Sequence, residues 1–139
     1  MITPNRFCRC LLICLLACNL LADNPPIRVT IEGKCPDCDE AQMVSALSHE
    51  FRKLDGVLVT DTEPALKIDF GVMRLRDSTG HVLNGYASSV AVTSIDNRLT
   101  AHLVTTDNTI EKLAHRIAIG VDGSVIKQMR RDTQPSSSP

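Results

Sequence analysis

Two cysteines separated by two residues are the part of this 139-residue sequence best suited to chemistry. Cys35 and Cys38, in the run Cys35-Pro36-Asp37-Cys38, fall between a predicted strand and a predicted helix. The amino terminus of a helix favours the thiolate form of a cysteine, because the helix dipole and free backbone N–H groups stabilise negative charge. A disulfide, a soft-metal site and thiol-disulfide exchange all use this chemistry. The position of the pair therefore leaves three interpretations open.

The first interpretation is a structural disulfide between Cys35 and Cys38. Cysteines in an exported chain are expected to oxidise in pairs, and this pair is the one left after the amino-terminal segment is processed. A loop this short gains little stability from chain entropy. The bond would mainly fix the joint between strand and helix.

The second interpretation is a soft-metal site. The runs Val29-Thr-Ile-Glu-Gly33, Cys35-Pro-Asp-Cys38, Ala46-Leu47 and Leu54-Asp-Gly-Val57 resemble the first half of a heavy-metal-associated domain. The resemblance implies that Cys35 and Cys38 bind copper(I) or a related ion between two thiolates. The Met-Thr pair that this family has before its first cysteine is missing, and a predicted hairpin takes the place of its second helix.

The third interpretation is thiol-disulfide exchange, because Cys-Pro-x-Cys at the start of a helix also resembles glutaredoxins and thioredoxins. Those folds place a cis-proline opposite the cysteine pair, and a small or β-branched residue precedes that proline. The one candidate, Pro64, instead follows Glu63, and it lies too close in sequence to the cysteines, before the predicted hairpin. Exchange is therefore disfavoured relative to metal binding.

The amino-terminal residues have the pattern of an export signal. Arg6 and Arg9 precede an apolar run over residues 11–17 that is too short to span a bilayer. Leu15-Leu16-Ala17-Cys18 resembles the bacterial lipobox, which implies cleavage after Ala17 and lipidation of Cys18. Ordinary cleavage after Ala22 is the alternative, with Leu20 at a position that usually holds a small residue.

The lipobox resemblance also predicts where the protein resides. Acyl chains on Cys18 would anchor an otherwise soluble domain to a membrane. Asn19 rather than aspartate follows the cysteine, so resemblance to lipoproteins of double-membrane bacteria implies the outer membrane, facing the periplasm. A soluble periplasmic or secreted protein is the alternative. Residues 19–26 are expected to form a tether, residues 27–132 a single domain, and residues 133–139 a disordered tail.

The first half of that domain has the pattern of a β-α-β unit. Apolar and polar residues alternate over residues 27–32, and apolar residues recur every three or four positions over residues 39–54. Asp37 and Glu40 have the spacing of a capping box. A short apolar strand over residues 57–60 should lie parallel to the first strand.

The second half has the pattern of an antiparallel hairpin or meander and a carboxy-terminal helix. Strands are expected over residues 66–75, with a bulge near Gly71, then over residues 82–95 and 99–104. Capping residues at 106–108 precede an apolar stripe that Gly120 and Gly123 should kink or split. The predicted fold is α+β, a two-layer sandwich.

Composition excludes several classes of function. The formal net charge is −1 and aromatic residues make up 3% of the chain, which argues against nucleic-acid binding. No phosphate-binding or nucleophile motif occurs, so neither a cofactor nor an enzymatic activity is expected. The order of elements resembles the amino-terminal domain of TolB and the core of the curli-secretion lipoprotein. This resemblance implies an envelope binding or scaffold module with a protein partner, which a sheet edge at residues 99–104 would accept.

Overall fold

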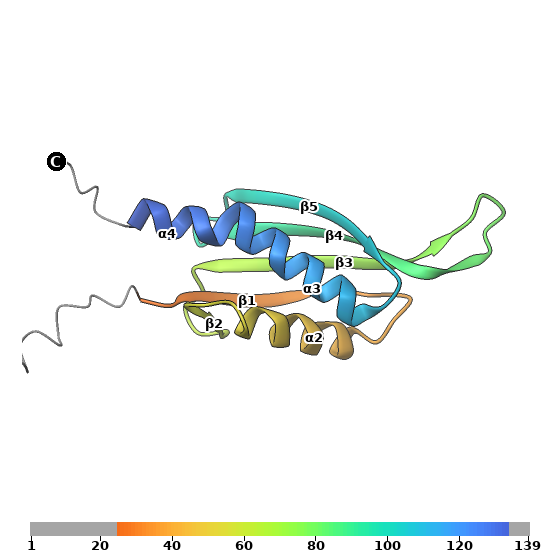
Figure 1. Cartoon of the computed structure of the whole chain (residues 1–139), viewed down its shortest axis with the longest axis horizontal. Helices are drawn as coiled ribbons and strands as arrows, with labels where there is room; N and C mark the ends of the chain where they lie inside the picture. Colours follow the sequence, from red (N-terminus) through yellow and green to blue (C-terminus); the bar gives the residue numbers. More distant parts are fainter. Residues whose placement is uncertain (1–24, 134–139) are drawn as a thin grey trace, which may run out of the picture.

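Five strands form one mixed sheet in the computed structural model, which describes residues 25–133. The expectations for the export signal, Cys18, residues 19–24 of the tether and residues 134–139 of the tail fall outside these residues, and Thr133, the first residue of the predicted tail, ends α4. The elements are β1 (Ile27–Lys34), α2 (Glu40–Arg52), β2 (Val57–Val59), β3 (Leu66–Arg76), β4 (Val82–Ser94), β5 (Leu99–Asp107), α3 (Ile110–Val121), a π-helical turn (Asp122–Ile126) and α4 (Lys127–Thr133). The strand order is β2-β1-β3-β4-β5, and the helices lie on one face of the sheet (Figure 1). The expected α+β class is confirmed.

The β-α-β unit forms as predicted, with β1 parallel to β2 and also to β3. The expected capping box is wrong, because Asp39 caps α2 and its carboxylate accepts hydrogen bonds from the N–H groups of Ala41 and Gln42. Asp37 instead accepts a hydrogen bond from the N–H of Arg74 in β3. Asp37 is thus bonded to β3, and Asp39 starts the helix.

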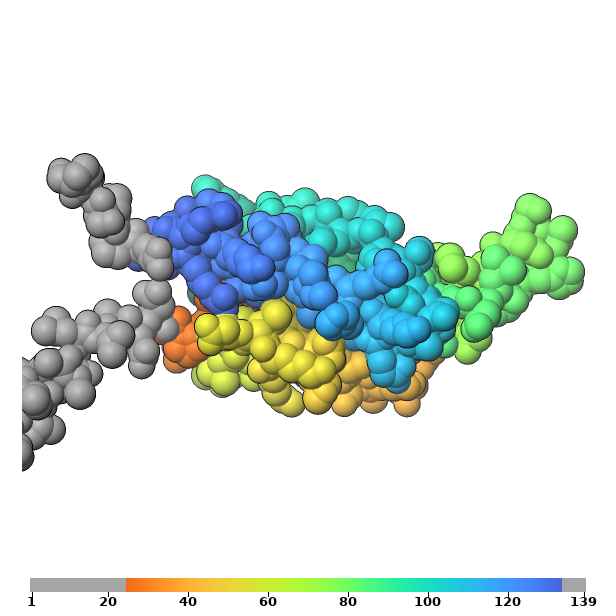
Figure 2. Space-filling view, viewed as in Figure 1, coloured from red at the N-terminus to blue at the C-terminus, as the bar shows by residue number. Residues whose placement is uncertain are grey.

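The long hairpin of β3 and β4 extends beyond the helices (Figures 1 and 2). The bulge expected near Gly71 is wrong, since Gly71 pairs regularly with Ser89. The register shifts between Arg74 and Arg76 instead. Near this shift, a side chain added to Gly85 would closely approach Leu75 and the backbone of Asp107, so the chain packs tightly around this glycine.

Strand β5 is longer than predicted and ends at Asp107 rather than Val104. Residue 107 pairs with Tyr86 in β4, and its carboxylate also accepts the N–H of Asn108. The helix therefore starts later than residues 106–108 suggest. Its N-cap is Thr109, whose hydroxyl accepts the N–H of Lys112.

The carboxy-terminal helix is split where glycines were expected to disturb it. A π-helical turn over Asp122–Ile126 separates α3 from α4, and it contains Gly123. Gly120 has a different role, because a side chain there would meet the Leu103 side chain of β5 at 2.7 Å. It allows α3 to pack closely on the sheet edge.

Apolar side chains of the helices and of one sheet face form the core. The two long helices, α2 and α3, lie side by side over this face (Figure 2). Helix α2 contributes Met43, Leu47 and Phe51, and α3 contributes a stripe of six buried residues. No helix within residues 25–133 combines the length and apolar character needed to span a bilayer. In the described part of the chain, the other face of the sheet carries no helix.

An ion-pair cluster on Glu50 links the two helices and makes stability depend on pH. Its carboxylate lies 2.5 Å from Lys53 Nζ and 2.8 Å from His115 Nδ1. These hydrogen bonds, from Lys53 first and His115 second, lower the pKa of Glu50 below 4.5. The stabilisation is therefore complete above the unfolded-state pKa and is lost as the pH falls through the lowered value.

We expect Glu50→Gln to lose less than about 1 kcal/mol of unfolding free energy at neutral pH, because the cluster is partly exposed. Urea unfolding at pH 7 and pH 3 measures this loss. The difference between wild type and variant should be smaller at pH 3 than at pH 7. A difference that grows on acidification would contradict the assignment.

Candidate functional site

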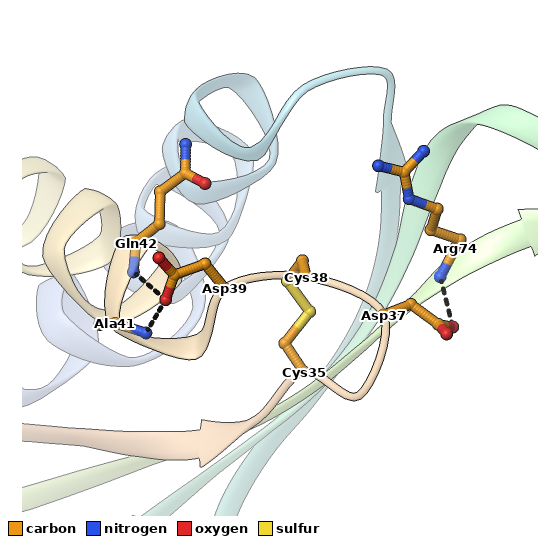
Figure 3. The surroundings of a disulfide bond; sticks show 7 residues. All are labelled: Cys35, Asp37, Cys38, Asp39, Ala41, Gln42 and Arg74. Carbon is orange, nitrogen blue, oxygen red and sulfur yellow. Dashed lines mark hydrogen bonds between the residues drawn. A yellow bond between two sulfur atoms is a disulfide. The ribbon is translucent and has the colours of Figure 1, made fainter.

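The Cys35-Pro36-Asp37-Cys38 segment forms a small loop closed by a disulfide (Figure 3). The Cα atoms of Cys35 and Cys38 are 5.3 Å apart. Cys35 is buried against the core, and Cys38 is half-buried at its edge. The loop lies between the end of β1 and the start of α2, as the sequence predicts.

Two aspartates tie this disulfide loop to its surroundings. The Asp39 carboxylate accepts the N–H of Ala41 at 2.9 Å, which fixes the start of α2. The Asp37 carboxylate accepts the N–H of Arg74 at 3.3 Å, next to the register shift in β3 (Figure 3). The loop therefore joins β1, α2 and the base of the long hairpin.

Three features of this geometry bear on the metal and exchange interpretations. The sulfur atoms of Cys35 and Cys38 are bonded to each other, so a soft ion could bind only after reduction. Within residues 25–133 no three His, Cys, Asp or Glu side chains gather as a metal site. The peptide bond before Pro64 is trans, and this proline leads into β3.

We expect the natively purified protein to have no free thiol at Cys35 or Cys38. Thiol titration in denaturant, with and without prior reduction, measures this, and copper(I) added to the reduced protein tests metal binding. Replacing both cysteines with serine should cost at most about 2 kcal/mol, because the closed loop is short. Free thiols in the native protein together with copper(I) uptake would favour the metal interpretation.

Strand β5 forms an open edge of the sheet. It is nine residues long and contains neither proline nor lysine. Exposed apolar side chains lie along it: Leu99 is 63% exposed, Val104 is 71% exposed, and Ile119 of the adjacent helix α3 is 55% exposed. The opposite edge ends in β2, which has three residues. The β5 edge therefore offers a partner strand a longer backbone to pair with than the β2 edge does.

The sheet face without helices carries a shallow groove of about 460 Å³. Gly71 is one of the residues that line it, and an added Cβ there would find no atom within 4 Å. Residues of the disulfide loop and of strands β1, β3, β4 and β5 line it: Lys34, Pro36, Gly71, Val72, Met73, Ala87, Ser88, Ser89 and Val104. The disulfide loop, the open edge and the groove thus share one region of the molecule.

A serine and a histidine beside the groove are brought together only by folding. The Ser89 hydroxyl lies 2.8 Å from His102 Nε2. The two residues lie thirteen positions apart and meet through the β4–β5 register, a relation that the sequence does not display. Both side chains are exposed, and in the described part of the chain no further hydrogen bond orients His102. A nucleophile of the serine-histidine type needs such a third group.

No protein-family model matches the sequence, and no curated protein matches it. Among solved structures, protein XCC0632 from Xanthomonas campestris, of family DUF330, superposes with a TM-score of 0.53 at 8% identity, covering 80% of this chain and 93% of that one. A PelC dodecamer from Paraburkholderia phytofirmans gives 0.49 at 8% identity, covering 70% and 84%. Hypothetical protein CT253 from Chlamydia trachomatis gives 0.44 at 9% identity, covering 76% and 89%. The likeness to XCC0632 shows that this chain shares its fold.

Proposed function

We propose that this protein is an exported, non-enzymatic binding or scaffold module of the cell envelope. Its Cys18 would carry the lipid anchor, and the domain would face the periplasm from the outer membrane. The partner is a protein that adds a strand to β5. Backbone hydrogen bonds supply most of the affinity in such strand addition, and side-chain pockets supply the specificity.

The observation that carries this proposal is the unprotected edge of β5. Free edges in natural sheets are usually short or carry lysine, proline or a covering segment, because an open edge recruits other strands. Strand β2 follows this rule with its three residues. Strand β5 does not, and its exposed Leu99 and Val104 would add apolar contact to the backbone pairing.

Photo-crosslinking in intact envelopes tests the partner proposal. A photoreactive residue is placed at Leu99 or Val104 in β5, and as a matched control at Leu58, an exposed leucine on the opposite edge strand. We expect one discrete protein adduct from the β5 positions and none from Leu58. The same adduct from both edges, or no adduct at all, would overturn the proposal.

Cys18→Ser tests the anchor. We expect the variant to lose acyl labelling and membrane association completely, and globomycin should block processing of the wild type. Cys14→Ser, in the same apolar run, is the matched control and should retain both properties. Unchanged processing in the Cys18 variant would favour cleavage after Ala22.

A further inference from the structure

The groove around Gly71 lies where apolar and charged parts of the open face meet. In the β3 register, Gly71 pairs with Lys34 of β1 on one side and Ser89 of β4 on the other. On this face of the sheet, the next pair toward the hairpin is Met73 with Ala87, both apolar. Toward the other end, the next pair of β1 and β3 on this face is Glu32 with Asp69, both acidic. Lys34 stands at this boundary.

The groove as a whole is large enough for a small ligand. Its volume of about 460 Å³ lies in the range of small-molecule sites, which are mostly apolar with a few polar groups. Met73 is 61% exposed and Val104 71% exposed, so apolar surface remains uncovered there. Three strand spacings of about 4.8 Å put Val104 roughly 14 Å from Lys34 across the sheet, the reach of a medium-chain acyl group.

The charge pattern favours an anionic end group at Lys34. Lys67 forms an ion pair with Glu32, and this hydrogen bond, with Asp69 nearby, raises the pKa of Lys67. The acidic side chains of the neighbouring pair are therefore balanced by Lys67. Lys34 forms none of the ion pairs found within residues 25–133, so its ammonium group is open to an external anion.

We infer that the groove binds a free fatty acid, with the acyl chain over Gly71 and the carboxylate at Lys34. Pro36 of the disulfide loop forms one wall, and the absent side chain of Gly71 leaves the floor open. The groove shares Val104 with the strand-addition edge, but it uses side chains on the sheet face, whereas strand addition uses the backbone of β5. It extends the proposed function with a small ligand of stated class.

Laurate binding to the chain from residue 19, which lacks Cys18 and keeps the Cys35–Cys38 disulfide intact, tests the inference. Calorimetry gives the affinity below the micellar concentration, and amide NMR shifts give the location. We expect saturable binding with the largest shifts at Gly71, Ala87 and Ser89. No saturable binding, or shifts centred elsewhere, would overturn the inference.

Variants separate the acyl contact from the charge contact. Gly71→Phe places a ring in the groove, where an added Cβ meets no atom within 4 Å, and should weaken laurate binding at least about 10-fold. Met73→Gln should weaken laurate binding by a smaller factor. Lys34→Met should weaken laurate about 2- to 5-fold, the range of an exposed ion pair, and leave dodecanol binding unchanged. Thr93→Phe, in the same strand as Ser89 but away from the groove, is the control and should bind as wild type.

Comparing the affinity for a lysophospholipid with the affinity for laurate distinguishes a lipid-bound acyl chain from a free fatty acid. Lauroyl lysophosphatidylglycerol should bind more weakly than laurate, and tighter binding would overturn the choice of a free fatty acid. Wild-type affinity in Gly71→Phe would overturn the groove itself. None of these variants lies in β5, so the crosslinking result is independent of them.

Discussion

Replacing Gly33 with alanine is expected to cost about 3 kcal/mol of unfolding free energy, the upper range for forcing extra atoms into a packed site. Gly33 pairs with Phe70 across β1 and β3. An added Cβ would lie 2.1 Å from the Phe70 carbonyl oxygen and 2.6 Å from its ring. Backbone on one side and a buried ring on the other leave the new methyl group no room. Urea unfolding followed by circular dichroism measures the loss.

Gly71→Ala is the matched control for Gly33→Ala. It lies one residue pair further along the same two strands, and an added Cβ meets nothing within 4 Å. Alanine there should be neutral or stabilise the fold by about 0.5–1 kcal/mol, because it restricts the unfolded chain. Equal losses at both positions would contradict the close approach described for Gly33.

Ile117→Ala is expected to cost about 2–5 kcal/mol, the range for emptying a buried isoleucine site. Ile117 is fully buried on the stripe of α3 that packs on the sheet. The cost combines lost apolar burial with the cavity left behind. Thermal and urea unfolding of the variant should agree on its size.

Ile119→Ala provides the comparison within the same helix and the same residue type. Ile119 is 55% exposed beside the β5 edge, so the truncation should change stability by no more than about 0.5 kcal/mol. A large loss of unfolding free energy in Ile119→Ala would contradict the exposure of this side chain. It would indicate that the surface beside β5 is covered, as it would be in a complex formed through β5.

The helices and strands that were predicted correctly have a residue pattern within the element itself. The boundaries, cap and bulge that were predicted wrongly involve contacts between elements. Alternation over residues 27–32 and the stripe of α3 follow directly from side-chain periodicity. The cap of α2 depends on the Arg74 contact that occupies Asp37. The true register shift lies in the pairing of β3 with β4, and the end of β5 is set by its pairing with β4. None of these contacts leaves a local pattern.

The candidate site divides in the same way. The position of Cys35 and Cys38 between strand and helix follows from sequence, as does an edge strand starting at Leu99. The Ser89–His102 contact and the groove do not, because each combines side chains from separate strands. A glycine is read from sequence as a turn or bulge, whereas at Gly71 the missing side chain leaves the groove open.

The hairpin of β3 and β4 gives the molecule a long axis with two unlike poles. The start of β1 and the end of α4 lie at one pole, and the hairpin forms the other (Figure 1). At about 3.3 Å per residue, the hairpin tip stands roughly 40 Å from Ile27. If the chain is attached to a surface through residues preceding Ile27, the hairpin tip would therefore point away from that surface. A second molecule approaching from the opposite side would contact the hairpin before the rest of the domain.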